Sequence, residues 1–235
     1  LDALLIQSVK KLDNDFIPNI IDLCRYPNNA NGKLYSLPFV GNVSLFAYRT
    51  DLFAKYGLSE PKTWSDVLAA AKKISEKEPG VNGVSFRGVK GNPILTAFLP
   101  IFWSFGADFM DASGKPIVNS PEGIKALNFF LELAKYGPKS TPMNDTAQVR
   151  DGLLAGTVAI APEVWPAWLG KIDDPNESKV TGKVKITKHP GEVKKSSPMI
   201  AMWHVAIPAA SKNKEAVFDF LTFLTSKETQ KLMVM

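Results

Sequence analysis

The sequence is poor in the residues that most enzymes and metal proteins use for chemistry. It has one cysteine, Cys24, and two histidines, His189 and His204, among 235 residues. A single cysteine excludes an internal disulfide, and such sparse ligands do not supply a cysteine-rich or histidine-rich metal site. We therefore expect neither a metal nor another cofactor.

Catalytic motifs are missing as well. The chain contains no G-x-S-x-G elbow, no phosphate-binding P-loop, no G-x-G-x-x-G fingerprint and no H-E-x-x-H pair. With one cysteine and two histidines, nucleophilic triads have few ways to assemble. A pair of carboxylates for glycoside hydrolysis stays open, because its two members can be far apart in sequence. We expect no enzyme and no catalytic residues.

Long apolar runs and concentrated charge are also absent. The longest charge-free run, residues 91–107, is interrupted by prolines and glycines and is too short to span a membrane. The net charge is +5, and its main cluster, residues 179–195, alternates basic with apolar residues. That alternation predicts a solvated surface hairpin, and without interleaved aromatics it does not predict nucleic-acid binding.

The chain begins without Met, at LDALLIQSVKKL, and stops on QKLMVM. We interpret it as a fragment or a processed chain, so that the lack of a targeting signal does not indicate a compartment. The composition, 45% hydrophobic and 22% charged, is that of an ordinary globular protein.

Helical and strand patterns alternate along the chain. A helix is predicted after Thr63, whose cap is completed by Asp66, and another after Ser120 and Pro121. The apolar stripes expected on the three clearest helices are Val67, Ala71 and Ile74; Ile124, Leu127, Leu131 and Ala134; and Val217, Leu221 and Leu224. Short strands are expected at 34–38, 43–48, 84–86, 157–160, 183–186 and 205–207. This alternation indicates an α/β fold.

The segment 31–53 has a nearly continuous strand-like pattern, which is interrupted at Gly41-Asn42. It fits a chain that leaves one sheet and enters another, and it fits a local hairpin about equally well.

Tryptophans lie where we expect loops at strand ends. Trp165 and Trp168 follow a predicted strand and alternate with prolines, so we expect 161–168 to be neither helix nor central strand. Trp103 lies in LPIFWSFGAD, and Trp203 opens WHVAIP just before another predicted strand, so that we expect all four rings at strand ends. Such rings either pack a core or line a ligand site beyond the carboxyl ends of strands. A pyranose ring has a flat C–H face, and its hydroxyls need polar partners. Candidates for these partners are Asn42, Asn92, Glu163 and His204.

Five segments cover nearly the whole chain in a fixed order. They are NGKLYSLPF (31–39), YRTDLFAKYGLSEPKTWSDVLAAAKK (48–73), FWSFGADFMDASGKPIVNSPEGIKALNFF (102–130), LLAGTVAIAPEVWPAW (153–168) and WHVAIPAASKNKEAVFDFLTFLTSKETQ (203–230). Together they resemble the extracellular solute-binding proteins of ABC importers, in particular the sugar-binding, maltose-binding-like branch. The run DDPNESKVTGKVKITKHPG further resembles members that take up disaccharides or sugar alcohols.

The resemblance implies a periplasmic-binding-protein-like fold of two α/β lobes, one essentially complete here and the other partial. Residues 1–43 would belong to the first lobe and hinge, 44–202 to the second lobe, and 203–235 to the hinge and the return to the first lobe. It also implies a monomer that is periplasmic or extracellular, either free or anchored as a lipoprotein. Such a protein binds a carbohydrate or sugar alcohol and delivers it to permease subunits of an ABC transporter by lobe closure.

Five residues receive a role from the resemblance. Trp165 matches the aromatic platform that stacks on the sugar, and Asn42 falls at a polar hinge position that is often acidic in the family. Trp203 and His204 stand where many relatives have small residues at the hinge, and the bulky Trp203 would narrow the site. Trp103 matches a recurrent family tryptophan.

Two other functions stay open at this point. A carbohydrate-active enzyme would need two carboxylates facing the cleft. A binding protein for a polyamine or an oxyanion would need clustered acids or paired arginines, and the chain has only four arginines, Arg25, Arg49, Arg87 and Arg150.

Overall fold

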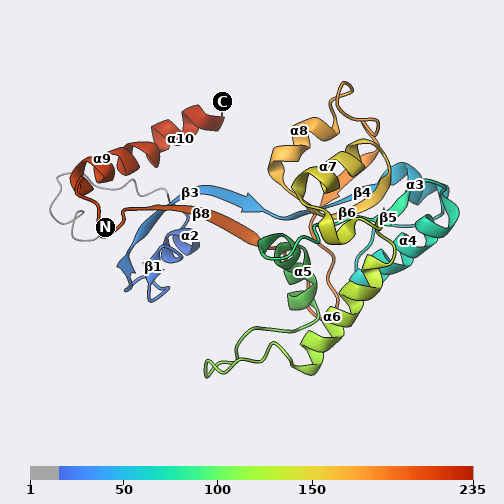
Figure 1. The fold of residues 1–235 in the computed structure, drawn as a ribbon, viewed down its shortest axis with the longest axis horizontal. Coiled ribbons are helices and arrows are strands. Elements are labelled where there is room, and N and C mark those ends of the chain that lie inside the picture. The colour runs from blue at the N-terminus through green and yellow to red at the C-terminus, as the bar shows by residue number, and fades with distance from the viewer. Residues whose placement is uncertain (1–15, 235) are drawn as a thin grey trace. The chain divides into compact units, whose positions relative to one another are not determined.

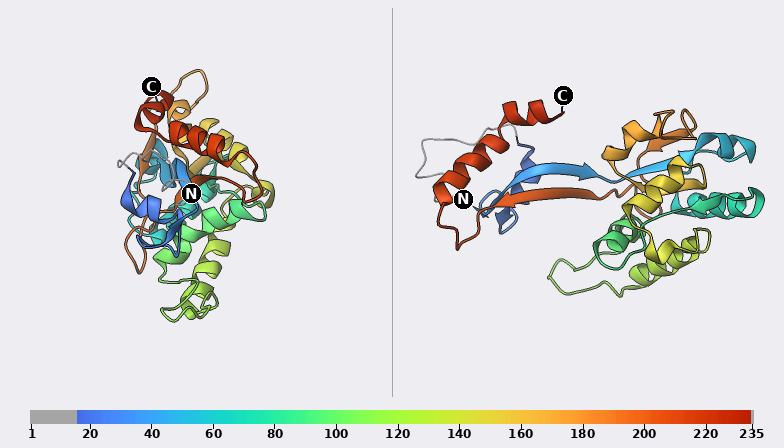
Figure 2. Two further views of the ribbon diagram at one scale, coloured as in Figure 1. Left: turned by 90° about the vertical axis from the view of Figure 1, so that its left-hand side faces the viewer. Right: turned by 45° about the horizontal axis from the view of Figure 1, so that its top comes forward.

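The computed structural model describes residues 16–234, which divide into two compact units (Figures 1 and 2). Unit 1 comprises residues 16–42 and 200–234, and unit 2 comprises Val43–Met199. The predicted assignment of the chain to two lobes stays a prediction.

Unit 1 is built around a two-stranded sheet of β3 (Ser36–Val43) and β8 (Ile200–Ala206), which lie side by side in Figures 1 and 2. A small core of Cys24, Leu34, Leu37 and Leu221 accompanies it. The other elements of unit 1 are α2 (Pro18–Asp22), the antiparallel pair β1 (Arg25–Tyr26) and β2 (Lys33–Leu34), α9 (Lys214–Leu224) and α10 (Lys227–Val234).

Unit 2 contains a four-stranded sheet in the order β5-β6-β4-β7. Strand β6 runs parallel to β5 and antiparallel to β4, and β7 is antiparallel to β4. The strands are β4 (Leu45–Arg49), β5 (Asn82–Val84), β6 (Val158–Val164) and β7 (Val184–Thr187). The helices are α3 (Thr50–Lys55), α4 (Trp64–Lys77), α5 (Asn92–Ser104), α6 (Pro121–Ala134), α7 (Thr146–Leu154) and α8 (Leu169–Ile172), with short 3-10 turns η1 (Thr141–Met143) and η2 (Pro166–Trp168).

Two apolar cores cover the two faces of this sheet. Successive side chains of β4 alternate between them: Phe46 and Tyr48 belong to the core shared with α4, α5 and α6, whereas Ala47 belongs to the core shared with α7 and α8. A sheet with helices on both faces confirms the predicted α/β class. None of the helices in residues 16–234 is long and apolar enough to cross a membrane.

The predicted helix starts are confirmed. Thr63 and Asp66 form a reciprocal capping box at α4, and the Ser120 hydroxyl accepts a hydrogen bond from the Gly123 amide at the start of α6. The predicted stripe of α4 is buried, as Val67, Ala71 and Ile74 all are.

The predicted apolar stripe of α6 is wrong for three of its four residues, and the fourth, Ala134, is partly buried against the core shared with α4 and α5. Its members Ile124, Leu127 and Leu131 are exposed, and the buried residues of this helix are Gly123, Ala126, Phe130 and Leu133. The helix carries apolar residues on more than one face, and the large Phe130 ring packs against Phe86 and Phe98. Packing of this aromatic cluster therefore decides which face turns inward. In α9 the buried residues are Phe218 and Leu221, so that only Leu221 of the predicted stripe is fully buried.

The expectation that residues 161–168 avoid a central strand is wrong for the first four. Strand β6 is central and continues through Pro162 to Val164. Its pairing with β4 steps from Ala47↔Ala161 to Leu45↔Val164, so that β6 has one extra residue at a bulge. Pairing with β5 ends at Ile160. Pro162 is tolerated because the missing N–H falls at the bulge, beyond the end of β5.

Two other predictions concern connections between strands. Strands β3 and β4 belong to different sheets, which confirms that the segment 31–53 passes from one sheet to another rather than forming a hairpin. The predicted hairpin in 179–195 is wrong, because β7 pairs with β4 as an edge strand and not with its own continuation. The alternation seen in the sequence is that of a sheet edge, with Lys183 and Lys185 exposed.

Candidate functional site

The parallel strands β5 and β6 end at the same edge of the sheet in unit 2. A basic, an acidic and an aromatic side chain lie at this edge. Arg87 follows β5 by three residues, Glu163 is the penultimate residue of β6, and Trp165 comes directly after it. This edge is where open α/β sheets bind ligands.

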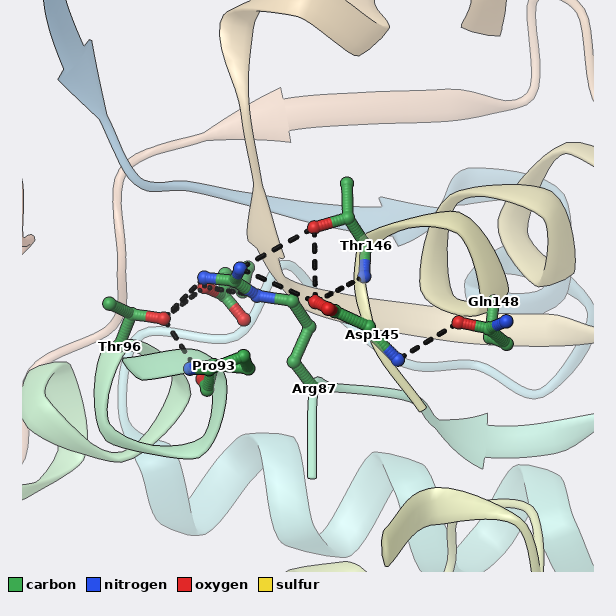
Figure 3. Close-up of polar contacts among 7 residues, drawn as sticks. Arg87, Pro93, Thr96, Asp145, Thr146 and Gln148 are labelled. Atoms are coloured by element: carbon green, nitrogen blue, oxygen red, sulfur yellow. Dashed lines mark hydrogen bonds and ion pairs between the residues drawn. The ribbon is translucent and has the colours of Figure 1, made fainter. Parts of the chain in front are cut away.

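Arg87 and Glu163 form a buried ion pair. The Arg87 Nε donates to Glu163 Oε1 at 3.0 Å, and its Nη2 contacts the same oxygen and Thr96 Oγ1 (Figure 3). Thr96, on α5, donates from its hydroxyl to Glu163 Oε1 at 2.7 Å. The Glu163 side chain is only 1% exposed, so that its charge depends on this guanidinium for compensation.

The other side of the guanidinium faces the start of α7. Arg87 Nη1 lies 3.6 Å from Asp145 Oδ1 and donates to Thr146 Oγ1 at 3.4 Å. Asp145 caps α7, because its carboxylate accepts from the Thr146 amide and its own amide donates to Gln148 (Figure 3). Arg87 thus joins the start of α7 to α5 and β6.

Trp165 is held against this cluster. The Arg87 Cζ atom lies 5.5 Å from the centroid of the Trp165 ring, within the range of a cation–π contact. The ring is partly buried and packs on the core formed with α7 and α8. Trp168, three residues on, is buried in that same core and does not present a free face.

One oxygen of the cluster has no hydrogen-bond partner. Glu163 Oε2 is buried, and no group in residues 16–234 donates to it. A buried carboxylate oxygen without a donor is costly, and native proteins seldom leave such a group unpaired without a reason. The cluster thus combines an aromatic ring held by Arg87 with a buried acceptor that no donor in the described residues satisfies.

The remaining predicted site residues lie elsewhere in the described chain. Asn92 is exposed at the first turn of α5, and Trp103 is partly buried near the end of that helix against the larger core. Asn42, Trp203 and His204 lie in unit 1, on β3 and β8. Trp203 is 66% exposed, and His204 Nδ1 lies 3.0 Å from Cys24 Sγ and 3.2 Å from Ser36 Oγ.

Sequence reasoning missed Arg87, Thr96 and Asp145. A signal for Arg87 was available, because this rare arginine directly follows a strand at the edge where Glu163 was expected to face a ligand. Thr96 and Asp145 carried no signal of their own, since only folding brings α5 and the α7 cap to β6. Residues 16–234 contain no group of three or more potential metal ligands.

The whole sequence can be compared with known proteins. Residues 1–231 match the family model described as bacterial extracellular solute-binding protein. A mannitol-binding protein of Pseudomonas aeruginosa is 31% identical over 227 residues, covering 94% of this chain and 50% of that protein. A probable amino-acid ABC transporter periplasmic-binding protein of Sinorhizobium fredii is 28% identical over 208 residues, covering 87% and 46%.

A solved structure agrees with these matches. The chain is similar to maltose-bound MalE3 of T. maritima, with a TM-score of 0.80 and 28% identity over 97% of this chain and 57% of that one. The chain therefore spans about half the length of the relatives it matches.

Proposed function

The chain belongs to the bacterial extracellular solute-binding proteins, and from this premise we propose that the whole protein binds a small sugar or sugar alcohol outside the membrane. It would deliver this ligand to the permease subunits of an ABC importer. Support comes from the relatives, one named for binding mannitol and one solved with maltose. The proposed location is periplasmic or extracellular, either free or anchored as a lipoprotein, and the proposed protein is a monomer.

The observation that carries the proposal is that Arg87 contacts both the Trp165 ring and the Glu163 carboxylate. The Trp165 ring would stack on the C–H face of the ligand, and Glu163 Oε2, which has no donor in residues 16–234, would accept a ligand hydroxyl. Arg87 would hold both groups in place. Because it pairs with Glu163, its charge is compensated, which favours a neutral ligand over an anion.

We place the remaining predicted ligand-binding residues on the second lobe and at the hinge. We assign unit 2, close to residues 44–202, to the second lobe, and residues 1–43 and 203–235 to the hinge and the first lobe. Asn92 and Trp103 would then contribute from the second lobe, and Asn42, Trp203 and His204 from the hinge side. Ligand contacts made by both lobes would favour the closed state.

No bond is broken in this proposal. The family is one of solute-binding proteins, and both carboxylates of the cluster are engaged: Glu163 with Arg87 and Thr96, and Asp145 with Arg87 and the Thr146 amide. A glycosidase would need a further, free carboxylate opposite this cluster.

The test is a thermal-shift screen of the full-length protein, followed by titration calorimetry of each hit. The panel holds mannitol, ribitol, maltose and monosaccharides, with amino acids and polyamines as the competing classes. A sugar or polyol should raise the melting temperature, since a ligand that binds only the folded state stabilises it. A screen in which only an amino acid or a polyamine binds would overturn the proposal.

A further inference from the structure

Unit 2 has a second place where buried polar atoms lack partners. Four such side-chain atoms occur in residues 16–234, and one of them is Glu163 Oε2. The other three, Trp64 Nε1, His189 Nδ1 and Ser196 Oγ, belong to residues grouped around the loop that follows β7. His189 and Ser196 line the same cavity, and the Trp64 ring centroid lies 5.9 Å from that of His189. Orphan polar atoms at one place point to an occupant with hydrogen-bonding groups.

The cavity has a volume of about 520 Å³, within the range of small-molecule sites. Its walls are two segments, residues 60–63 before α4 and residues 187–196, which begin at the last residue of β7. Backbone hydrogen bonds fix one wall against the other: the Trp64 amide donates to the Gly191 carbonyl at 2.9 Å, and the Gly191 amide donates to the Lys62 carbonyl at 3.0 Å. The Lys194 amide also donates to the Ser104 carbonyl of α5. The cavity is therefore part of the fold and not a gap between loose loops.

His189 sits in this wall as a neutral hydrogen-bonding group. Its side chain is 1% exposed, and its Nε2 lies 3.0 Å from Ser44 Oγ. Burial lowers the pKa of His189 to about 4, so that the ring is uncharged at neutral pH. With Nε2 engaged by Ser44, Nδ1 is the ring nitrogen that has no partner in residues 16–234.

The charges around the cavity favour an anion. Its acidic residues are already paired: Glu60 accepts from Lys62 and Lys185, and Glu192 accepts from the amide and hydroxyl of Ser65. Three lining lysines, Lys188, Lys194 and Lys195, have no carboxylate partner in residues 16–234. Their ammonium groups bring only hydrogen-bond donors and positive charge, for which phosphate and carboxylate oxygens are the matching acceptors.

We propose that this cavity is a second binding site of unit 2, for a small oxyanion that carries a phosphate or carboxylate group. Lys194 and Lys195 supply the charge, and Ser196 and His189 supply neutral hydrogen bonds from the wall. The site shares no residue with the Trp165 cluster. It is therefore independent of the sugar or polyol site proposed above.

The test is titration calorimetry of the full-length protein with inorganic phosphate and, separately, with citrate, at constant ionic strength. We expect saturable binding of at least one anion. Lys194→Ala combined with Lys195→Ala should weaken it at least about tenfold, which corresponds to about 1.4 kcal/mol. The matched control is Lys72→Ala combined with Lys77→Ala, which removes the same charge from exposed positions of α4 outside the cavity.

Two further variants test the wall. His189→Gln keeps a polar atom near Ser44 and removes Nδ1, and Ser196→Ala removes one hydroxyl with little risk to folding. Each should weaken the anion at least about threefold and leave the affinity for the sugar or polyol unchanged. Binding of phosphate alone or citrate alone identifies the source of the anion. Lack of saturable binding by either anion, or equal weakening by the control pair, would overturn the proposal.

Discussion

At the scale of single residues, the role of Trp165, ligand binding or core packing, depends on whether one face of its ring is free. The ring is partly buried on one core and touched by Arg87, whereas Trp168 is fully enclosed by the same core. These two tryptophans, three residues apart, form a natural pair for separating a binding role from a packing role.

We predict that Trp165→Ala weakens sugar or polyol binding by roughly 30-fold, because a central aromatic anchor contributes roughly 2 kcal/mol or more. The melting temperature without ligand should fall less than in Trp168→Ala, since a fully buried ring costs about 3–5 kcal/mol when truncated. Calorimetry and melts on both variants measure the two effects. If Trp165→Ala melts early and binds normally, Trp165 is a core residue and the site assignment is wrong.

The buried pair of Arg87 and Glu163 leads to a second prediction. Arg87→Met should destabilise the protein by about 3–5 kcal/mol, because it leaves the Glu163 carboxylate buried without its guanidinium. Adding Glu163→Met should restore much of the loss, since no buried charge then remains uncompensated. Urea unfolding of the two single variants and the double variant gives the coupling energy. Losses that simply add would contradict a tightly coupled pair.

His189 makes stability depend on pH. Its pKa is lowered by burial from 6.5 to about 4 in the folded protein, while hydrogen bonding to Ser44 acts in the opposite direction. Between pH 6.5 and 4, His189 binds a proton in the unfolded chain but stays neutral in the folded protein. The contribution of neutral His189 to the free energy of unfolding is therefore complete above pH 6.5 and is lost as the pH falls toward 4. The loss reaches about 3 kcal/mol near pH 4.

Urea unfolding between pH 7.5 and 4 checks this, in buffers without phosphate or citrate. The His189→Gln variant has no group at this position that titrates in that range. Its free energy of unfolding should therefore fall by about 3 kcal/mol less between pH 7.5 and 4. An equal slope in both proteins would place the pH dependence elsewhere.

At the scale of elements, helix α6 shows how neighbours select the buried face. Its predicted stripe contained Leu131, which is 56% exposed, whereas Leu133, two residues on, is 0% exposed in the core shared with α4 and α5. Both leucines belong to one helix and have the same propensity, so that only packing distinguishes them.

We predict that Leu133→Ala lowers the free energy of unfolding by about 2–5 kcal/mol, because it leaves a cavity in a close-packed core. Leu131→Ala should change it by less than about 1 kcal/mol, as for other exposed positions. Urea unfolding of the two variants side by side makes the comparison. Similar losses would mean that Leu131 is covered by another part of the full-length protein.

At the scale of the whole molecule, the proposed function requires two lobes that close on one ligand. The chain spans about half the length of the relatives it matches, so that the proposed closure is tested on the full-length protein. A ligand can shift an open–closed equilibrium only through contacts that differ between the two states.

We predict that the full-length protein becomes more compact when the sugar or polyol binds. Small-angle scattering should show a smaller radius of gyration at saturation. The Trp165→Ala variant should reach the same compaction at roughly 30-fold higher ligand concentration. A radius that stays constant at saturating ligand would contradict closure.

The sequence by itself determined what local chemistry controls. The capping residues Thr63, Asp66 and Ser120 specify helix starts through bonds within a few residues, and the alternation of β and α patterns indicates the α/β class. Five ordered motifs indicated the family. Each of these features depends on neighbours along the chain, so a linear reading can recover it.

Only the tertiary structure decided the rest. Pro162 lies in a central strand because a bulge against β4 absorbs its missing N–H, and Leu131 faces outward because Phe130 occupies the aromatic core. Arg87 meets Glu163 across 76 positions, and His189 reaches Ser44 across 145. These contacts join residues that no local pattern links, because burial and charge compensation are settled only when distant elements pack together.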